Sequence, residues 1–417
     1  NLAMVRRKRS VRARRNINQK QGRKERQQNK AIFRTLIEDL IPDGELFAEY
    51  RFHGNIKWTA EQLCQQALIW SWQDTTNVTD AFEQTGEICG TLGMNRIAHS
   101  YTALMNALDN YSAVLGNELR ERFQHLAELW AGRFWRNDGW VLMGFDGSAA
   151  TAPRTVSNEQ EFCAPNYGSG ATAKYAKKQT KGMRRRKNER NKPHPPPPQV
   201  WITLMWHMQL RLTWTWRLGP SNASERGHVE EMLQQEEFPK NTLFCGDAGF
   251  VGYPLWNTIL KANGDFLVRV GGNVKLLSET ADIKRRGGGI VLCWPKDRIN
   301  AGEEPLRLRL IQVKIGKTKM WMLTSVLAPK KLSKKKIVQF YKMRWGGEVE
   351  FRGLKQTLDK RYLRCRNSNR AYVELDWSIR AMALGELVAL REQIAHKSKQ
   401  KPDSKASYDP KDRSLAN

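Results

Sequence analysis

The chain contains little cysteine or histidine and no long apolar stretch. Its six cysteines lie far apart among 417 residues, with no CxxC pair or other zinc-ligand spacing, and its seven histidines are scattered. This pattern argues against a disulfide framework and predicts reduced cysteines, an intracellular protein and no zinc site. Because no run of eighteen apolar residues and no signal-peptide core are found, we expect neither a membrane span nor a secretory leader.

Acidic residues are scarce relative to basic ones. The chain has 70 Lys plus Arg against 42 Asp plus Glu, a formal charge of +28. Residues 1–30 hold twelve basic residues and one Glu, and residues 174–192 hold ten basic residues and one Glu, so these two segments supply +20 of the total. Neither shows apolar periodicity, as expected for solvated charge runs. Their shared positive sign predicts salt-sensitive contacts with nucleic-acid phosphates.

The segment 341–355 has the spacing Y-x2-R-x3-E-x6-K, formed by Tyr341, Arg344, Glu348 and Lys355. On a regular helix these four side chains fall within an arc of roughly 60°. One carboxylate surrounded by three donor-bearing side chains suits a site where Glu holds a divalent metal and its neighbours grip phosphates. The simpler interpretation is a solvated helix face with an i,i+4 Arg–Glu pair.

Two further acids stand at the ends of hydrophobic runs. Asp146 follows residues 140–145, Asp247 follows residues 242–246, and both runs are typical of buried strands. A lone Asp followed by a small residue is more often a turn residue than a catalytic one. Two strand-end acids together with the Tyr-Arg-Glu-Lys spacing favour a joint site, with Asp146, Asp247 and Glu348 as catalytic metal ligands.

These three acid blocks, in this order, resemble the DDE transposases of the IS4 type. The Tyr-Arg-Glu-Lys pattern of that family is fully matched, and the resemblance extends from about residue 140 to residue 363. It implies an RNase H-like catalytic fold, in which Asp146, Asp247 and Glu348 hold two Mg²⁺ (or Mn²⁺) ions. Arg344 and Lys355 are then expected to contact DNA phosphates, with Tyr341 bonding or stacking nearby.

The resemblance also implies a reaction and partners. We expect cleavage at transposon ends to free 3′-hydroxyls, terminal hairpins, and strand transfer into target DNA. The expected partners are terminal inverted repeats, target DNA and a second copy of the chain in a synaptic homodimer, on the nucleoid in a bacterial cytoplasm. Two alternatives stay open: an RNase H-like metal nuclease without strand transfer, and an inactive DNA-binding transposase relic. The chain's size and three acids argue against a ribosomal or chromatin protein.

The signature helix departs from a regular pattern at Gly346 and Gly347. Two glycines inside a helix cost about 1 kcal/mol each relative to alanine, so a bend or fray is expected, and a close backbone or DNA approach would explain them. Glu350 is the other acid near enough in sequence to compete with Glu348. Two residues along a regular helix turn a side chain by about 200°, which points Glu350 away from the site.

The domain organisation follows from changes in pattern along the chain. Helical periodicity in residues 31–136 fits a packing module and a DNA-end recognition domain equally well. The core is an α/β mixed sheet flanked by helices, with an expected hairpin at residues 200–217. The predicted segments are a basic disordered arm (1–30), a helical domain (31–136), a first core part (137–270) with a basic Pro-rich insertion (150–198), a β-rich insertion (271–329), a second core part (330–396) and a disordered tail (397–417).

Trp321 is a further candidate, because it lies in the β-rich insertion twenty residues before Tyr341. The resembled family can place an aromatic near this position to stack on a base flipped from the transposon end. With Met320 and Met322 beside it, filling the core of the insertion is the simpler interpretation. At the other end of the chain, Asn1 in place of Met suggests a fragment or an upstream-extended reading, with Met4 as the expected start.

Overall fold

The structure is a computed structural model, and it describes residues 31, 33–42, 44–50, 52, 54, 56–163, 197–272, 274–278 and 283–398. The chain divides into two compact units, Asn1–Arg122 and Phe123–Asn417. The predicted basic arm, most of the basic Pro-rich insertion and nearly all of the predicted tail lie outside the described residues.

The first unit is helical where it is described. A helix at residues 33–40 precedes α2 (Ala60–Ser71), α3 (Val78–Leu92) and the start of α4 (Tyr101–Ala131). Thr59 and Gln62 form a capping box that fixes the start of α2, because each side chain accepts from the other's backbone N–H. Gly93 ends α3 in the left-handed region at φ 70°, where a residue without Cβ is favoured.

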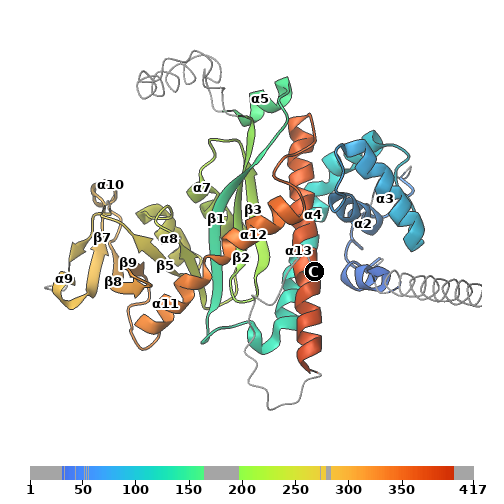
Figure 1. The fold of residues 1–417 in the computed structure, drawn as a ribbon. Coiled ribbons are helices and arrows are strands. Elements are labelled where there is room, and N and C mark those ends of the chain that lie inside the picture. The colour runs from blue at the N-terminus through green and yellow to red at the C-terminus, as the bar shows by residue number, and fades with distance from the viewer. Residues whose placement is uncertain are drawn as a thin grey trace, which may run out of the picture. The chain divides into compact units, whose positions relative to one another are not determined.

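The second unit is built on one nine-stranded sheet in the order β3-β2-β1-β4-β5-β9-β8-β7-β6 (Figure 1). The strands β1 to β3 form an antiparallel meander, β1, β4 and β5 run parallel, and β9 joins β5 antiparallel. The strands are β1 (Val141–Thr151), β2 (Gln199–His207), β3 (Leu212–Gly219), β4 (Thr242–Gly246), β5 (Asp265–Val270), β6 (Leu277–Ser278), β7 (Gly288–Cys293), β8 (Leu306–Ile315) and β9 (Thr318–Thr324).

The order β3-β2-β1-β4-β5, with a meander followed by two parallel strands, is an RNase H-like arrangement, so the predicted fold class is confirmed. The expected hairpin beside the first strand is also confirmed, as β2 and β3. The segment predicted to be a β-rich insertion contains β6 to β9, and these strands extend the same sheet beyond β5.

Helices cover both faces of the sheet. They are α5 (Val156–Phe162), α7 (Glu225–Gln235), α8 (Tyr253–Lys261), α9 (Ile283–Arg286), α10 (Lys296–Asn300), α11 (Lys334–Met343), α12 (Gly346–Arg352) and α13 (Ser368–Ser398), with short turns of 3-10 helix at Gly132–Phe134 and of π-helix at Gly353–Thr357. In the part of the chain that the structure describes, none of the helices is long and apolar enough to span a bilayer.

The face that each helix covers follows from strand register, because paired residues of neighbouring strands point the same way. Trp216 is level with Asp146 across β2, and its indole N–H donates to Asp376 of α13 at 2.9 Å. The next residue, Arg217, points to the other face and donates to Glu231 of α7 at 2.7 Å. The side chain of Asp146 therefore leaves β1 on the face that α13 covers.

Trp206 sets the distance between β1 and α12. Its indole is fully buried on β2, opposite Gly144 in the strand register. A Cβ added to Gly144 would lie 2.6 Å from Trp206 Cζ2, and a Cβ added to Gly347 would lie 2.9 Å from the same atom. Both distances are shorter than real Cβ contacts, so the ring fills the space that two missing side chains leave. This packing explains Gly347 of the glycine pair.

We expect Gly347→Ala to lower the free energy of unfolding by about 1–3 kcal/mol, because the added methyl group overpacks a rigid indole. Alanine is the better helix former, so propensity alone predicts the opposite sign. Gly346→Ala is the matched control, since its Cβ would make an ordinary contact of 3.6 Å with Trp206. Urea denaturation of both variants measures the difference, and equal effects would contradict this packing.

Candidate active site

Asp146 lies within β1, the strand at the centre of the RNase H-like arrangement. It is half-buried, and the backbone N–H of Gly147 donates to its Oδ1 at 2.9 Å. The strand continues to Thr151, so Asp146 does not end it as the sequence suggested. Its neighbour β4 does end here, one residue before the level of Asp146.

Asp247 follows directly after β4. The parallel register pairs Val141 with Thr242 and Gly144 with Cys245, and continuing it by two residues brings Asp247 level with Asp146. The carboxylate of Asp247 accepts from the backbone N–H of Gly249 at 2.6 Å, which holds it in the turn after the strand. The two strand acids predicted from the sequence are therefore brought together at neighbouring positions of the sheet.

The predicted signature helix is broken into three pieces. The first piece, α11, ends at Met343, α12 begins at Gly346, and the π-helical turn Gly353–Thr357 follows. The expected bend at the glycine pair is confirmed, whereas the assumption of one regular helix with all four side chains on one face is wrong. Backbone hydrogen bonds from Gly347 and Glu348 reach back only three residues, to Arg344 and Trp345, as in a tightened turn.

Arg344 connects the break to the strand acids. Its Nη1 lies 3.5 Å from Oδ2 of Asp146, and its side chain is 12% exposed. The guanidinium carbon also lies 5.5 Å from the centre of the Tyr341 ring. Tyr341 itself is buried in the core with Phe340 and Trp206, so its ring lies under Arg344 and does not project among the acids.

Lys355 reaches the same strand from the π-helical turn. Its Nζ donates to Oγ of Ser148 at 2.6 Å, and burial, followed by the nearby Arg361, lowers the pKa of its ammonium group. Ser148 lies two residues after Asp146, so both side chains point to one face of β1. Arg344 and Lys355 thus contact this part of β1 at Asp146 and Ser148, while their contacts with DNA phosphates stay a prediction.

Glu348 and Glu350 separate as the helical angle predicted. Glu350 is 2% exposed, and its Oε1 lies 3.2 Å from Nε of Arg211, the residue before β3. Glu348 is exposed, and its negative charge acts on Asp146. Glu350 therefore has a structural partner, while Glu348 lies on the side of the strand acids.

The carboxyl group of Asp146 shows how these charges interact. Burial raises its pKa, the Gly147 hydrogen bond and Arg344 oppose that rise, and the negative charges of Asp247 and Glu348 add to it. Asp247 and Glu348 are therefore each close enough to Asp146 to repel its carboxylate. A cation relieves such repulsion, and carboxylate oxygens are the ligands that Mg²⁺ and Mn²⁺ prefer.

Glu225, the first residue of α7, was not among the predicted site residues. Its carboxylate lies against the backbone of Gly147, because a Cβ added there would be 2.5 Å from Cδ of Glu225. Burial raises the pKa of this carboxyl group, and the charges of Asp146 and Asp247 raise it further. The sequence signal was Gly147 itself, since only a residue without a side chain admits the carboxylate next to Asp146.

Two tryptophans, Trp321 and Trp345, lie in the segments around the predicted site. Trp321 is half-buried on β9, between Met320 and Met322, which pack into the core on the face that α11 covers. Because side chains alternate along a strand, Trp321 points to the opposite face. Trp345, which the sequence analysis did not single out, is 58% exposed at the break that follows Arg344.

Carboxylate oxygens are suitable ligands for a divalent cation, but the side chains of these acids are not close enough together here to enclose one. Within the described ranges, no three His, Cys, Asp or Glu residues lie close enough to enclose a metal ion. Arg344 is paired with Asp146, and within the described part of the chain its Nε is buried without a hydrogen-bond partner. The guanidinium is thus held close to the acids with part of its bonding capacity unused.

The sequence matches the model of one known protein family. Residues 211–384 match the family model of the transposase DDE domain. This span contains Asp247, Glu348 and the Tyr-Arg-Glu-Lys residues, but it begins after Asp146. The match confirms the resemblance to DDE transposases, while the IS4 type stays a prediction. The position of Asp146 rests on the register of β1 with β4.

A cryo-EM structure of the piggyBac transposase synaptic complex with hairpin DNA is similar with 10% sequence identity and a TM-score of 0.43, covering 89% of this chain and 77% of that chain. No match was found among curated proteins.

We expect Glu225→Gln to stabilise the fold at neutral pH in the presence of EDTA. A carboxyl group whose folded pKa is raised disfavours folding when it is ionised, and this penalty vanishes as pH falls and the group is protonated in both states. The gain in melting temperature should therefore be present at pH 7, shrink as pH falls through the raised pKa of Glu225, and be absent below about pH 4. We expect a small gain, because an acid at a helix N-terminus is otherwise favourable.

Glu230→Gln is the control, because it makes the same change of charge in the same helix, five residues further along the chain. Melting curves at several pH values compare the two variants. If Glu225→Gln lowers the melting temperature at pH 7, or raises it equally at every pH, Glu225 is not repelled by the strand acids.

Proposed function

We propose that this protein is a DNA transposase of the IS4 type, which cleaves the ends of an insertion sequence and joins them to target DNA. One observation carries the proposal. Asp146 and Asp247 are level on neighbouring parallel strands, and Arg344 of the Tyr-Arg-Glu-Lys segment is paired with Asp146. The transposase DDE domain match over residues 211–384 supports the same reading.

Asp146, Asp247 and Glu348 would hold two Mg²⁺ or Mn²⁺ ions, with Glu225 beside them. Bound ions of this kind activate water or a 3′-hydroxyl and stabilise the leaving oxygen in an in-line displacement at phosphorus. Burial raises the pKa of Asp146, and the negative charges of Asp247 and Glu348 raise it further, so the ionised carboxylate is disfavoured without a nearby cation. Ion binding at this site is therefore coupled to relief of that repulsion.

Arg344 and Lys355 would bind DNA phosphates on either side of the acids. Each contacts the strand in the structure, at Asp146 and Ser148 respectively. Arg344 exchanges one anion for another when it leaves Asp146 for a phosphate, so its guanidinium remains paired throughout. A bidentate pair with phosphate is also the geometry that a planar guanidinium favours.

The DNA partner is supported by the net charge of +28. Phosphate contacts made by the basic segments 1–30 and 174–192 would add affinity that does not depend on sequence. Terminal inverted repeats would then be selected by contacts with bases. A homodimer that pairs two ends in one complex belongs to this proposal, as does action on the bacterial nucleoid.

Asp146→Asn, Asp247→Asn and Glu348→Gln should each reduce Mg²⁺-dependent cleavage of transposon ends by at least about a thousandfold, because each removes a metal ligand at the reacting phosphate. The substrate is a duplex that carries the inverted repeats flanking the coding region. End binding, measured by mobility shift, should stay within a few-fold of the unmodified protein. A variant that still cleaves removes that residue from the site, and cleavage without joined products in the unmodified protein favours a nuclease.

Glu350→Gln and Glu348→Gln should separate stability from cleavage. Glu350→Gln leaves Arg211 without its carboxylate in a buried pair, so the free energy of unfolding should fall by about 3 kcal/mol while the folded fraction still cleaves. Glu348→Gln should change stability little and remove cleavage. Denaturation curves and cleavage assays on both variants decide, and the reverse pattern would reassign the third metal ligand to Glu350.

A further inference from the structure

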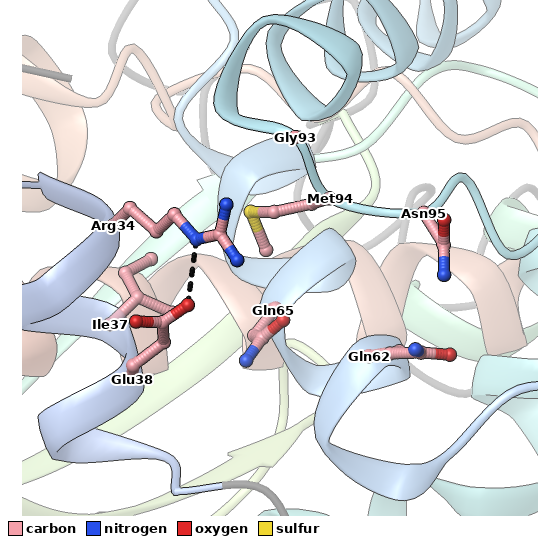
Figure 2. Close-up of a pocket in the computed structure, with 8 residues that line it drawn as sticks. All are labelled: Arg34, Ile37, Glu38, Gln62, Gln65, Gly93, Met94 and Asn95. Carbon is pink, nitrogen blue, oxygen red and sulfur yellow. Dashed lines mark hydrogen bonds and ion pairs between the residues drawn. The ribbon is translucent and has the colours of Figure 1, made fainter. Parts of the chain in front are cut away.

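The helical unit contains a cavity of about 160 Å³ (Figure 2). Its walls come from the helix at residues 33–40, from α2 and from the loop after α3. A water molecule takes roughly 30 Å³ of liquid, so the space exceeds what one ordered water fills. The lining residues are Arg34, Ile37, Glu38, Gln62, Gln65, Gly93, Met94 and Asn95.

Gln65 is the unusual member of this set. It is 6% exposed, and its side-chain amide has no hydrogen-bond partner among the described residues. Within the same part of the chain, Nε2 of the neighbouring Gln66 also lacks a partner, although the other end of that amide is bonded. Glu61 accepts from a backbone N–H at 3.1 Å, Gln66 accepts from another at 3.0 Å, and Ser71 donates to a backbone carbonyl at 2.8 Å. Figure 2 shows the Gln65 amide in the cavity, between the carboxylate of Glu38 and the amide of Gln62.

The lining residues of the cavity carry no net charge, so they do not favour a phosphate as its occupant. Arg34 is the one cation of the lining set, and its Nε lies 2.7 Å from Oε1 of Glu38. Its Nη1 also donates to the carbonyl of Leu92 at 3.4 Å. The half-exposed guanidinium is thus paired with a carboxylate, and the apolar side chains of Ile37 and Met94 line the same cavity. An uncharged ligand with apolar faces and a polar edge suits these walls.

We infer that this cavity binds one unpaired nucleobase of the DNA on which the protein acts, an inference that rests on the proposed function. A base is planar, its faces pack on Met94 and on the plane of the Arg34 guanidinium, and its edge carries donors and acceptors. A carboxamide presents one donor group and one acceptor side by side, which matches the N6 and N7 positions of adenine. Gln65 therefore reads the base, and adenine is the base that it prefers.

Binding of three single-stranded oligonucleotides to the full chain tests this inference. The oligonucleotides share one backbone length and carry adenine, cytosine or abasic sites throughout, so phosphate contacts are equal and only the bases differ. Fluorescence anisotropy gives the ratio of affinities. Gln65→Leu removes the amide at nearly constant volume, Gln65→Glu leaves only acceptors, and Gln84→Leu, at an exposed position of α3, is the matched control.

We expect the unmodified protein and Gln84→Leu to prefer adenine over abasic sites by about fivefold to a hundredfold. Gln65→Leu should lose most of this preference and melt at a higher temperature, because it removes an amide that has no partner. Gln65→Glu should shift the preference from adenine towards cytosine, whose N4 amino group donates to a carboxylate.

An unchanged base preference in Gln65→Leu, or a lower melting temperature that reveals a structural role for the amide, overturns the inference. End cleavage measured on the same preparations keeps the two proposals apart. If the protein cleaves ends but shows no base preference that depends on Gln65, only the inference about the cavity is wrong. If it shows this base preference but does not cleave ends, only the proposed transposase reaction is wrong.

Discussion

The parallel pairing of β1 with β4 is the constraint on which the candidate site depends. Residues of adjacent parallel strands keep a fixed register, so one pairing of Gly144 with Cys245 determines that Asp146 and Asp247 lie side by side. The side chains of both strands before these acids are mostly hydrophobic and buried. A slip of the register by one residue would move every side chain of a strand to the opposite face of the sheet. The sheet therefore holds two like charges together against their mutual repulsion.

The third segment depends on a second packing constraint, the burial of Trp206 between β1 and α12. The indole occupies space above Gly144 and below Gly347, which brings the broken helix close to the strand acids. Arg344 then reaches Asp146, Lys355 reaches Ser148, and Glu350 is fixed to Arg211 on another side. Burial of Asp146 and the negative charges of Asp247 and Glu348 disfavour its ionised form, and this is the physical basis for expecting a cation there.

Much of the arrangement could be predicted from local pattern, because strand periodicity and helical spacing are local properties. The hydrophobic runs before Asp146 and Asp247 indicated the strands, and the angle between Glu348 and Glu350 indicated their separate directions. The buried position of Tyr341 and the extent of the helix break could not be predicted, since they depend on Trp206, which lies far away in sequence. Glu225 was missed for the same reason, because its approach to Gly147 is a tertiary contact.

Anomalous diffraction from crystals grown or soaked with Mn²⁺ tests the central claim most directly. We predict a peak within about 2.1 Å of carboxylate oxygens from both Asp146 and Asp247, the distance expected for a small hard divalent ion, with Arg344 moved away from Asp146. Peaks elsewhere on the chain, or an intact Arg344–Asp146 pair with no ion at saturating Mn²⁺, would contradict a metal-dependent site built on the two strand acids.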